Sequence, residues 1–338
     1  LKNWSRATWI SIGLLVGAFL LFANTFRSEF LNYDDWWIVH PERMAGWLTP
    51  SGLNDLFFGF SKNVRMEHGA EYLPVRDLSA AFQARWFGSN VLGYHFVQIL
   101  LFGFSCVLFF HLLLMLEAGF SVACLGAFVF LSHPLHVESV AWLSGHKDLL
   151  SLVFVLAHLI AYVRRRWIMA LIFLVLAVGS KYHALIVPLL LPFIDRSLGR
   201  PFSWERFVAF FFVSTVGYVL ASFVASIVQY GHIHLGADPL AVVRNVPVVF
   251  DVTMKHLIAP TKLQILYPFH AASGWLDARL LRGLAVLIVS LSLFAWGWRH
   301  RPLVSFSIAL ILVGLVPMFR APEMHFLADR YLLFPSLG

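Results

Sequence analysis

The sequence predicts an all-α polytopic membrane protein, and three observations lead to that prediction. Of its 338 residues, 59% are hydrophobic and only 13% are charged, whereas a soluble domain carries about 25% charged residues. Several apolar segments approach the roughly 20 residues that a helix needs to cross a bilayer. The turns between these segments are short and rich in arginine, which is typical of loops that stay in the cytoplasm.

Nine segments are apolar enough to be counted as membrane spans, although some of them are short. A short span is tolerated where neighbouring helices shelter its backbone from lipid. The nine segments are residues 9–26, 91–116, 120–131, 149–163, 167–178, 185–194, 207–228, 280–298 and 303–319. We expect residues 1–338 to form a single transmembrane domain with about nine or more helices.

The arginine-rich turns set the expected orientation. If the N-terminus lies in the cytoplasm, so do the turns at residues 117–119, 164–166, 195–206 and 299–301, which carry most of the clustered arginines. The large loops are then external, and we expect short interfacial helices in the first of them. These loops are residues 28–90, 133–147, 229–277 and 320–334.

The net charge of +7 could suggest a nucleic-acid partner. Much of it lies in the short turns between spans, so we interpret it as a signal of membrane topology. We expect membrane lipid as a partner and no nucleic acid.

An acidic pair, Asp34 and Asp35, follows the first predicted span. Two adjacent carboxylates in a low dielectric raise the pKa of at least one of them. A carboxylate with a raised pKa can act as a general base toward a hydroxyl group. The alternative is an interfacial loop with solvated acids.

A second cluster lies where the short third span ends. It contains His133, His136 and Glu138, with Lys147 and Asp148 shortly after. Three interpretations stay open: a metal site, a hydrogen-bonded interfacial turn, and a pocket for an acceptor or a phosphate. The possible metal ligands are Asp35, His133 and Glu138, so the use of a divalent metal also stays open.

Several cations fall on the same predicted face. Lys181 sits between two short apolar runs, where it could snorkel to the lipid headgroups or bind phosphate as a point charge. Arg244 and Arg330 suit phosphate because a guanidinium can bond two oxygens, and Asp329 precedes the second of them. Together with the acidic pair, these cations suggest a reaction on a lipid-anchored phosphate. The carboxylate would activate an acceptor hydroxyl while the phosphate leaves.

Several motifs resemble those of a known membrane family. Residues 131–142 read LSHPLHVESVAW and residues 145–151 read GHKDLLS, similar to the family signature HPxHxExVAW…GRKDLLS. Shorter matches occur in the same order along the chain. They are NYDD at 32–35, YLPVR at 72–76, FGSNVLGYH at 87–95, SK at 180–181, LYP at 266–268 and ADRYLLFPSLG at 328–338.

These motifs resemble the transmembrane and tetratricopeptide-repeat O-mannosyltransferases and their bacterial relatives, within the C-type glycosyltransferase (GT-C) superfamily. The resemblance implies a GT-C fold and an inverting transfer of sugar from a polyprenyl-phosphate donor to a hydroxyl of a protein, or of a glycan or lipid. It implies that Asp34 is the base. Family members continue with further spans and repeats, which we expect downstream. At the arginine of GRKD this chain has His146.

The resemblance also implies a location. We expect an integral protein of the bacterial inner membrane with its site facing the periplasm, or of the endoplasmic reticulum membrane in a eukaryote. Two other functions stay open. The chain could be a non-catalytic membrane subunit that anchors a larger assembly, or a transporter of lipid-linked sugars. Transporters tend to carry repeat symmetry and polar residues at the midplane, whereas the polar residues here gather at one predicted face.

Overall fold

The computed structural model describes residues 2–31, 35, 38, 40–228, 239–261, 263–320 and 326–338. The protein is 79% helical, so the predicted all-α class is confirmed. The described strands are two short ones, β1 (Tyr267–Pro268) and β2 (Phe326–Leu327), which pair antiparallel. The described chain divides into two compact units. The first comprises Leu1–Ser132, Ser139–Leu185 and Glu205–Ile233; the second comprises His133–Glu138, Ile186–Trp204 and His234–Gly338.

Four described helices are long and apolar enough to cross a membrane. They are α6 (Val91–Met115), α9 (His146–Val163) with the short turn before it, α12 (Trp204–Val228) and α14 (Ala278–His300). Shorter apolar helices cover other predicted spans: α1 (Lys2–Leu21), α7 (Phe120–Ser132), α10 (Trp167–Ser180) and α15 (Pro302–Leu315). The count of nine or more membrane spans stays a prediction, as does the GT-C fold.

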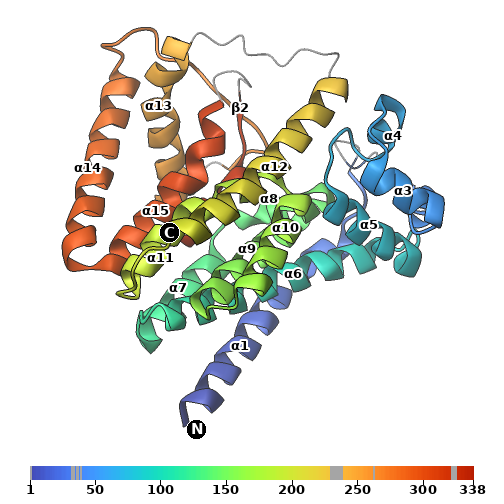
Figure 1. Cartoon of the computed structure of the whole chain (residues 1–338), viewed down its shortest axis with the longest axis horizontal. Coiled ribbons are helices and arrows are strands. Elements are labelled where there is room, and N and C mark those ends of the chain that lie inside the picture. Colours follow the sequence, from blue (N-terminus) through green and yellow to red (C-terminus); the bar gives the residue numbers. More distant parts are fainter. Residues whose placement is uncertain are drawn as a thin grey trace. The chain divides into compact units, whose positions relative to one another are not determined.

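The first unit is built on apolar helices that pack side by side. Helix α6 contacts α1, α7 and α9, and α9 pairs closely with α10 (Figure 1). The first predicted loop contains the expected short helices: α2 (Pro41–Gly46), α3 (Pro50–Phe58), α4 (Lys62–Glu67) and α5 (Pro74–Phe87). Proline begins α2, α3 and α5, where its missing N–H costs nothing. Side chains of this segment form a hydrophobic core that includes Met44, Trp47 and Leu56.

The second unit packs α13 (Pro239–Ile258) against α14, and α14 against α15 (Figure 1). Its core includes Val248, Val249 and Phe250 of α13. The segment 229–277, predicted as an external polar loop, contains this 20-residue helix. Pro247 lies inside α13, and polar residues occur between the apolar residues of this helix. The sequence therefore lacks the continuous apolar run of a membrane span.

Two more predicted boundaries differ from the structure. The predicted span 185–194 is divided between a 3-10 helix, η4 (Tyr182–Leu190), and α11 (Leu191–Ser197). Pro188 lies inside the first and Pro192 opens the second, so no continuous α-helix forms. The first span ends at Leu21 and passes into a 3-10 turn, η1 (Ala23–Arg27), so it ends earlier than expected. Elsewhere α8 (His136–Ala141) and the 3-10 turn η3 (Leu143–Gly145) occupy the predicted loop 133–147.

Candidate functional site

Of the acidic pair, the structure describes Asp35, whereas Asp34 lies outside the described residues. Asp35 is fully buried in the first unit. Its Oδ1 accepts hydrogen bonds from the Ser144 amide at 3.1 Å and the Ser144 hydroxyl at 2.7 Å, and its Oδ2 accepts one from the Leu31 amide at 3.0 Å. These bonds fasten the segment that follows the first span to η3.

A polar network holds η3 from its other side. Gln98 on α6 donates through Nε2 to the carbonyl of Trp142 at 3.0 Å, so its Oε1 is the atom that faces His146 Nδ1 at 3.2 Å. His146 Nδ1 must then carry the proton, and its Nε2 accepts from Ser79 at 2.9 Å and Gln83 at 3.2 Å. His146 is therefore a neutral, fully bonded side chain at the start of α9.

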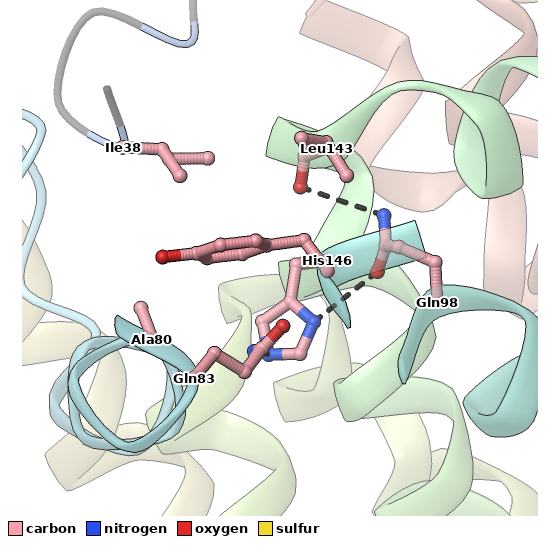
Figure 2. A pocket seen from close by; sticks show the side chains of 7 residues that line it. Ile38, Ala80, Gln83, Gln98, Leu143 and His146 are labelled. Carbon is pink, nitrogen blue, oxygen red and sulfur yellow. Dashed lines mark hydrogen bonds between the residues drawn. The ribbon is translucent and has the colours of Figure 1, made fainter. Parts of the chain in front are cut away.

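These residues border a small pocket in the first unit. Figure 2 shows His146, Gln83 and Gln98 around it, with Ile38, Ala80 and Leu143 completing its labelled lining. The dashed bonds in that view run from Gln98 to Leu143 and to His146. The polar side chains that line the pocket form hydrogen bonds with one another and with the turn before α9. They therefore stabilise this turn and leave few polar groups for a ligand.

Lys181 and Asp148 form a buried ion pair. Helices α9 and α10 are antiparallel neighbours, so the first turn of α9 and the end of α10 meet. The side chains are 10% and 5% exposed, respectively. A carboxylate in the first turn of a helix is also stabilised by the helix dipole. The predicted phosphate-binding lysine is thus already neutralised by a carboxylate of the predicted pocket.

Lys147, the neighbour of Asp148, pairs with Glu71 instead. The Glu71 Oε2 accepts from Lys147 Nζ at 2.7 Å and from Arg76 at 2.6 Å. Arg76 also bonds Asp77 and the carbonyl of His68, and both Arg76 and Asp77 are almost completely buried. Burial by itself would raise the pKa of Glu71, but Lys147 and Arg76 outweigh it and lower the pKa to about 2. Glu71 is consequently ionised throughout the physiological range.

The second unit contains the other predicted residues. Glu138 accepts hydrogen bonds from the guanidinium of Arg330 and, at 2.8 Å, from the Arg330 amide. Each side chain of the pair is 10% exposed. Asp329 accepts a bond from the Tyr267 hydroxyl at 3.1 Å. Burial raises the pKa of Asp329 to about 6, the Tyr267 bond opposes the rise, and the charge of Glu138 adds to it.

The two predicted histidines act as hydrogen-bond donors. His133 Nε2 lies 2.9 Å from the carbonyl of Leu257, which can only accept, so this nitrogen carries the proton. His136 Nε2 lies 2.9 Å from the Ser336 hydroxyl, which itself donates to the carbonyl of Leu333. These contacts agree with the interpretation of a hydrogen-bonded turn. Within the described part of the chain, no group of three or more His, Cys, Asp or Glu side chains could hold a metal ion.

Arg244 is placed differently from the other predicted cations. It lies on α13, and its Nε is buried without a hydrogen-bond partner among the described residues. Arg330, by contrast, is held by Glu138 within the same unit. The structure thus joins Glu138 with Arg330 in this unit, and Asp148 with Lys181 in the first one.

Several residues in these contacts were not predicted from the sequence to be functional. Arg76, Tyr267 and Ser336 stand inside the motifs quoted for the family resemblance, which gave a signal but no role. Glu71 and Asp77 flank the YLPVR motif at 72–76. In the sequence these two residues are only charged side chains near Pro74, the proline that begins α5. Such a pattern is too common to indicate a functional site.

Comparison with known proteins gives partial matches. The chain is 32% identical over 113 residues to a protein O-mannosyl-transferase of Caenorhabditis elegans, covering 32% of this chain and 16% of that protein. It is 28% identical over 148 residues to a protein O-mannosyl-transferase of Xenopus laevis, covering 43% of this chain and 17% of that protein. Part of this chain is similar to protein O-mannosyl-transferases. No protein-family model matches it, and no solved structure does.

These matches support the family resemblance inferred from the motifs. The chain spans less than a fifth of the length of either relative, since the shares are 16% and 17%. Apolar helices and these relatives together indicate a membrane protein.

Proposed function

We propose that this chain is the membrane-embedded catalytic part of a protein O-mannosyltransferase of the GT-C superfamily. It transfers a sugar, mannose by similarity to the relatives, from a polyprenyl-phosphate donor to a hydroxyl of a protein acceptor. The reaction takes place on the non-cytoplasmic face of the membrane. That face is the lumen of the endoplasmic reticulum in a eukaryote and the periplasm in a bacterium.

The chemistry is a single displacement with inversion. The acceptor oxygen forms a bond to the anomeric carbon, and the bond from that carbon to the phosphate oxygen breaks. Asp34 takes the proton of the hydroxyl, and the phosphate leaves with the electron pair of the broken bond. Lys181, Arg330 and Arg244 are the cations proposed to stabilise the phosphate charge. A phosphate is a good leaving group, so the reaction needs no general acid. A bound divalent metal is not required by these steps.

One observation carries the proposal. The residues of the family motifs are distant in sequence, yet they meet as buried polar pairs within each unit. Asp35 is bonded to Ser144 in one unit, and Glu138 is bonded to Arg330 in the other. Burial of charged groups is costly unless a function or a specific pairing retains them. Buried polar pairs formed by residues of these motifs therefore support an enzyme site.

The anchoring-subunit function is the second candidate. Lys181 and Arg330 are both occupied by carboxylates, as they would be in a scaffold that holds helices together. An anchoring subunit would need these pairs for stability but would not need Asp34.

The test is sugar transfer by the purified full-length protein carrying Asp34→Asn. Loss of a general base lowers the rate by about 10²–10⁴, whereas donor binding should change little because Asp34 contributes no attraction to a phosphate. Glu42→Gln is the matched control, since Glu42 is an exposed carboxylate of the same loop on α2. Transfer at the wild-type rate by Asp34→Asn would move the base elsewhere. Transfer by neither Asp34→Asn nor wild type, in a folded protein, would favour the anchoring subunit.

A further inference from the structure

The ion-paired cluster of the first unit has a buried side and an open side. On the buried side, Arg76 and Lys181 have side chains 1% and 10% exposed, each with a carboxylate of its own. On the open side, Lys147 is 19% exposed and its partner Glu71 is 32% exposed. An incoming anion can therefore reach the Lys147–Glu71 pair with the least rearrangement.

Glu71 occupies a point where several positive charges act together. Its Oε2 is bonded to both Lys147 and Arg76, and the charge of Lys181 also contributes to its low pKa. Arg65 lies in the same cluster and is bonded to backbone carbonyls, including Gly59. A carboxylate oxygen and a phosphate oxygen make the same kind of charge-assisted bond to ammonium and guanidinium groups. The position of the Glu71 carboxylate is thus suited to a phosphate oxygen.

The backbone beside Glu71 is held by a hydroxyl group from another segment. The next residue, Tyr72, is clamped by Tyr182, which accepts from the Tyr72 amide at 2.9 Å and donates to its carbonyl at 3.1 Å. Glu71 itself lies between α4 and α5, outside either helix. Withdrawal of the carboxylate therefore requires a change of side-chain rotamer and leaves the helices in place.

We propose that Lys147 and Arg76 form a phosphate-binding site that Glu71 occupies in the ligand-free protein and vacates when a phosphate group binds. The inference rests on the proposed function in taking the donor polyprenyl phosphate as the natural occupant. It also assigns different roles to two lysines. Lys147 contacts the phosphate directly, whereas Lys181, which is paired with Asp148, stabilises the phosphate through its charge.

The test is binding of farnesyl phosphate to the purified full-length protein in detergent, by titration calorimetry. Lys147→Gln should weaken binding by about tenfold or more, because it removes a charge-assisted bond. Glu71→Gln should tighten binding by about threefold to tenfold, because it removes a competing negative charge. In the double variant the gain from Glu71→Gln should shrink, since the two residues act at one site. Arg85→Gln, which removes an exposed cation from the same helix as Arg76, should bind like wild type.

The sign of the Glu71 effect separates this site from a structural ion pair. A purely structural Glu71 would give weaker or unchanged binding in Glu71→Gln, and either result overturns the proposal. If Glu71→Gln does not fold, Glu71→Ala serves instead, because it also removes the competing carboxylate from Lys147 and Arg76 and should likewise tighten binding. Farnesyl phosphate binding that is unaffected by Lys147→Gln likewise overturns the site.

Further ligands identify the source of the phosphate. Farnesol should not compete. Competition by inorganic phosphate at a similar affinity supports the anion site with free phosphate as its occupant. Phosphatidylglycerol that binds more tightly than farnesyl phosphate, and depends on Lys147, overturns the donor assignment. Sugar transfer is measured in parallel: Lys147-dependent binding without transfer by wild type supports the site and counts against the proposed function, while transfer without Lys147-dependent binding does the reverse.

Discussion

The buried pair of Glu138 and Arg330 gives the sharpest prediction about stability. Glu138→Gln keeps the shape of the side chain and removes its charge. Arg330 then keeps a positive charge in a place where its side chain is 10% exposed. Breaking a fully buried ion pair by neutralising one partner costs about 3–5 kcal/mol. Because both side chains retain some exposure, we expect about 3 kcal/mol, the lower end of this range.

The measurement is the free energy of unfolding in mixed micelles, from a denaturing-detergent titration of the purified protein. Arg330→Gln should cost a similar amount. The double variant Glu138→Gln/Arg330→Gln should cost clearly less than the sum of the single changes, since two amides can bond each other without a buried charge. Coupling energies for residues in contact are about 0.5–3 kcal/mol, and we expect a value in the upper half of that range.

Lys255→Gln provides the matched control in the same unit. Lys255 pairs with Asp251 on α13, but its side chain is 54% exposed. Exposed ion pairs contribute about 0–1 kcal/mol, so this change should have little effect. A cost of Glu138→Gln no larger than that of Lys255→Gln, with additive effects in the double variant, would refute the argument from burial.

Two further predictions concern His146 and Asp329. His146→Arg should lower the free energy of unfolding by about 3 kcal/mol or more. The reason is that the added N–H donors of arginine would face Ser79 and Gln83, which themselves donate hydrogen bonds to this position. A His146→Gln variant that is less stable than His146→Arg in the same unfolding assay would contradict the deduced neutral tautomer of His146. The raised pKa of Asp329, about 6, means that the folded protein retains a proton that the unfolded chain releases near pH 4. The contribution of Asp329 to stability is therefore complete below about pH 4 and is lost as the pH rises to about 6. Asp329→Asn should remove this loss. The stability of the variant relative to wild type should therefore increase from about pH 4 to about pH 6 and stay constant above that range. A constant difference in stability from pH 4 to 7 would show that Asp329 does not titrate there.

The helices were the most predictable part of the fold. Span 91–116 is observed as Val91–Met115 and span 120–131 as Phe120–Ser132, because an apolar run must form backbone hydrogen bonds within itself wherever it is buried. Local signals also set boundaries, as at Asn90, whose side chain accepts from the Leu92 amide at the start of α6. Helix α13 escaped prediction because its apolar face is interrupted by polar residues and Pro247. Its packing against α14 is what buries that face.

Composition and hydrophobic periodicity are local properties, so the amino-acid sequence was enough to indicate which residue types are available to the site and where the apolar helices run. It did not determine which charges meet. Lys181 could have been an exposed point charge, but the antiparallel packing of α9 and α10 places it against Asp148. Lys147, one residue before Asp148, faces Glu71 from a different segment. Ion pairs of this kind join residues far apart in the chain, and their energy depends on burial and on distances of a few ångströms. They therefore follow from the three-dimensional packing of the helices and loops.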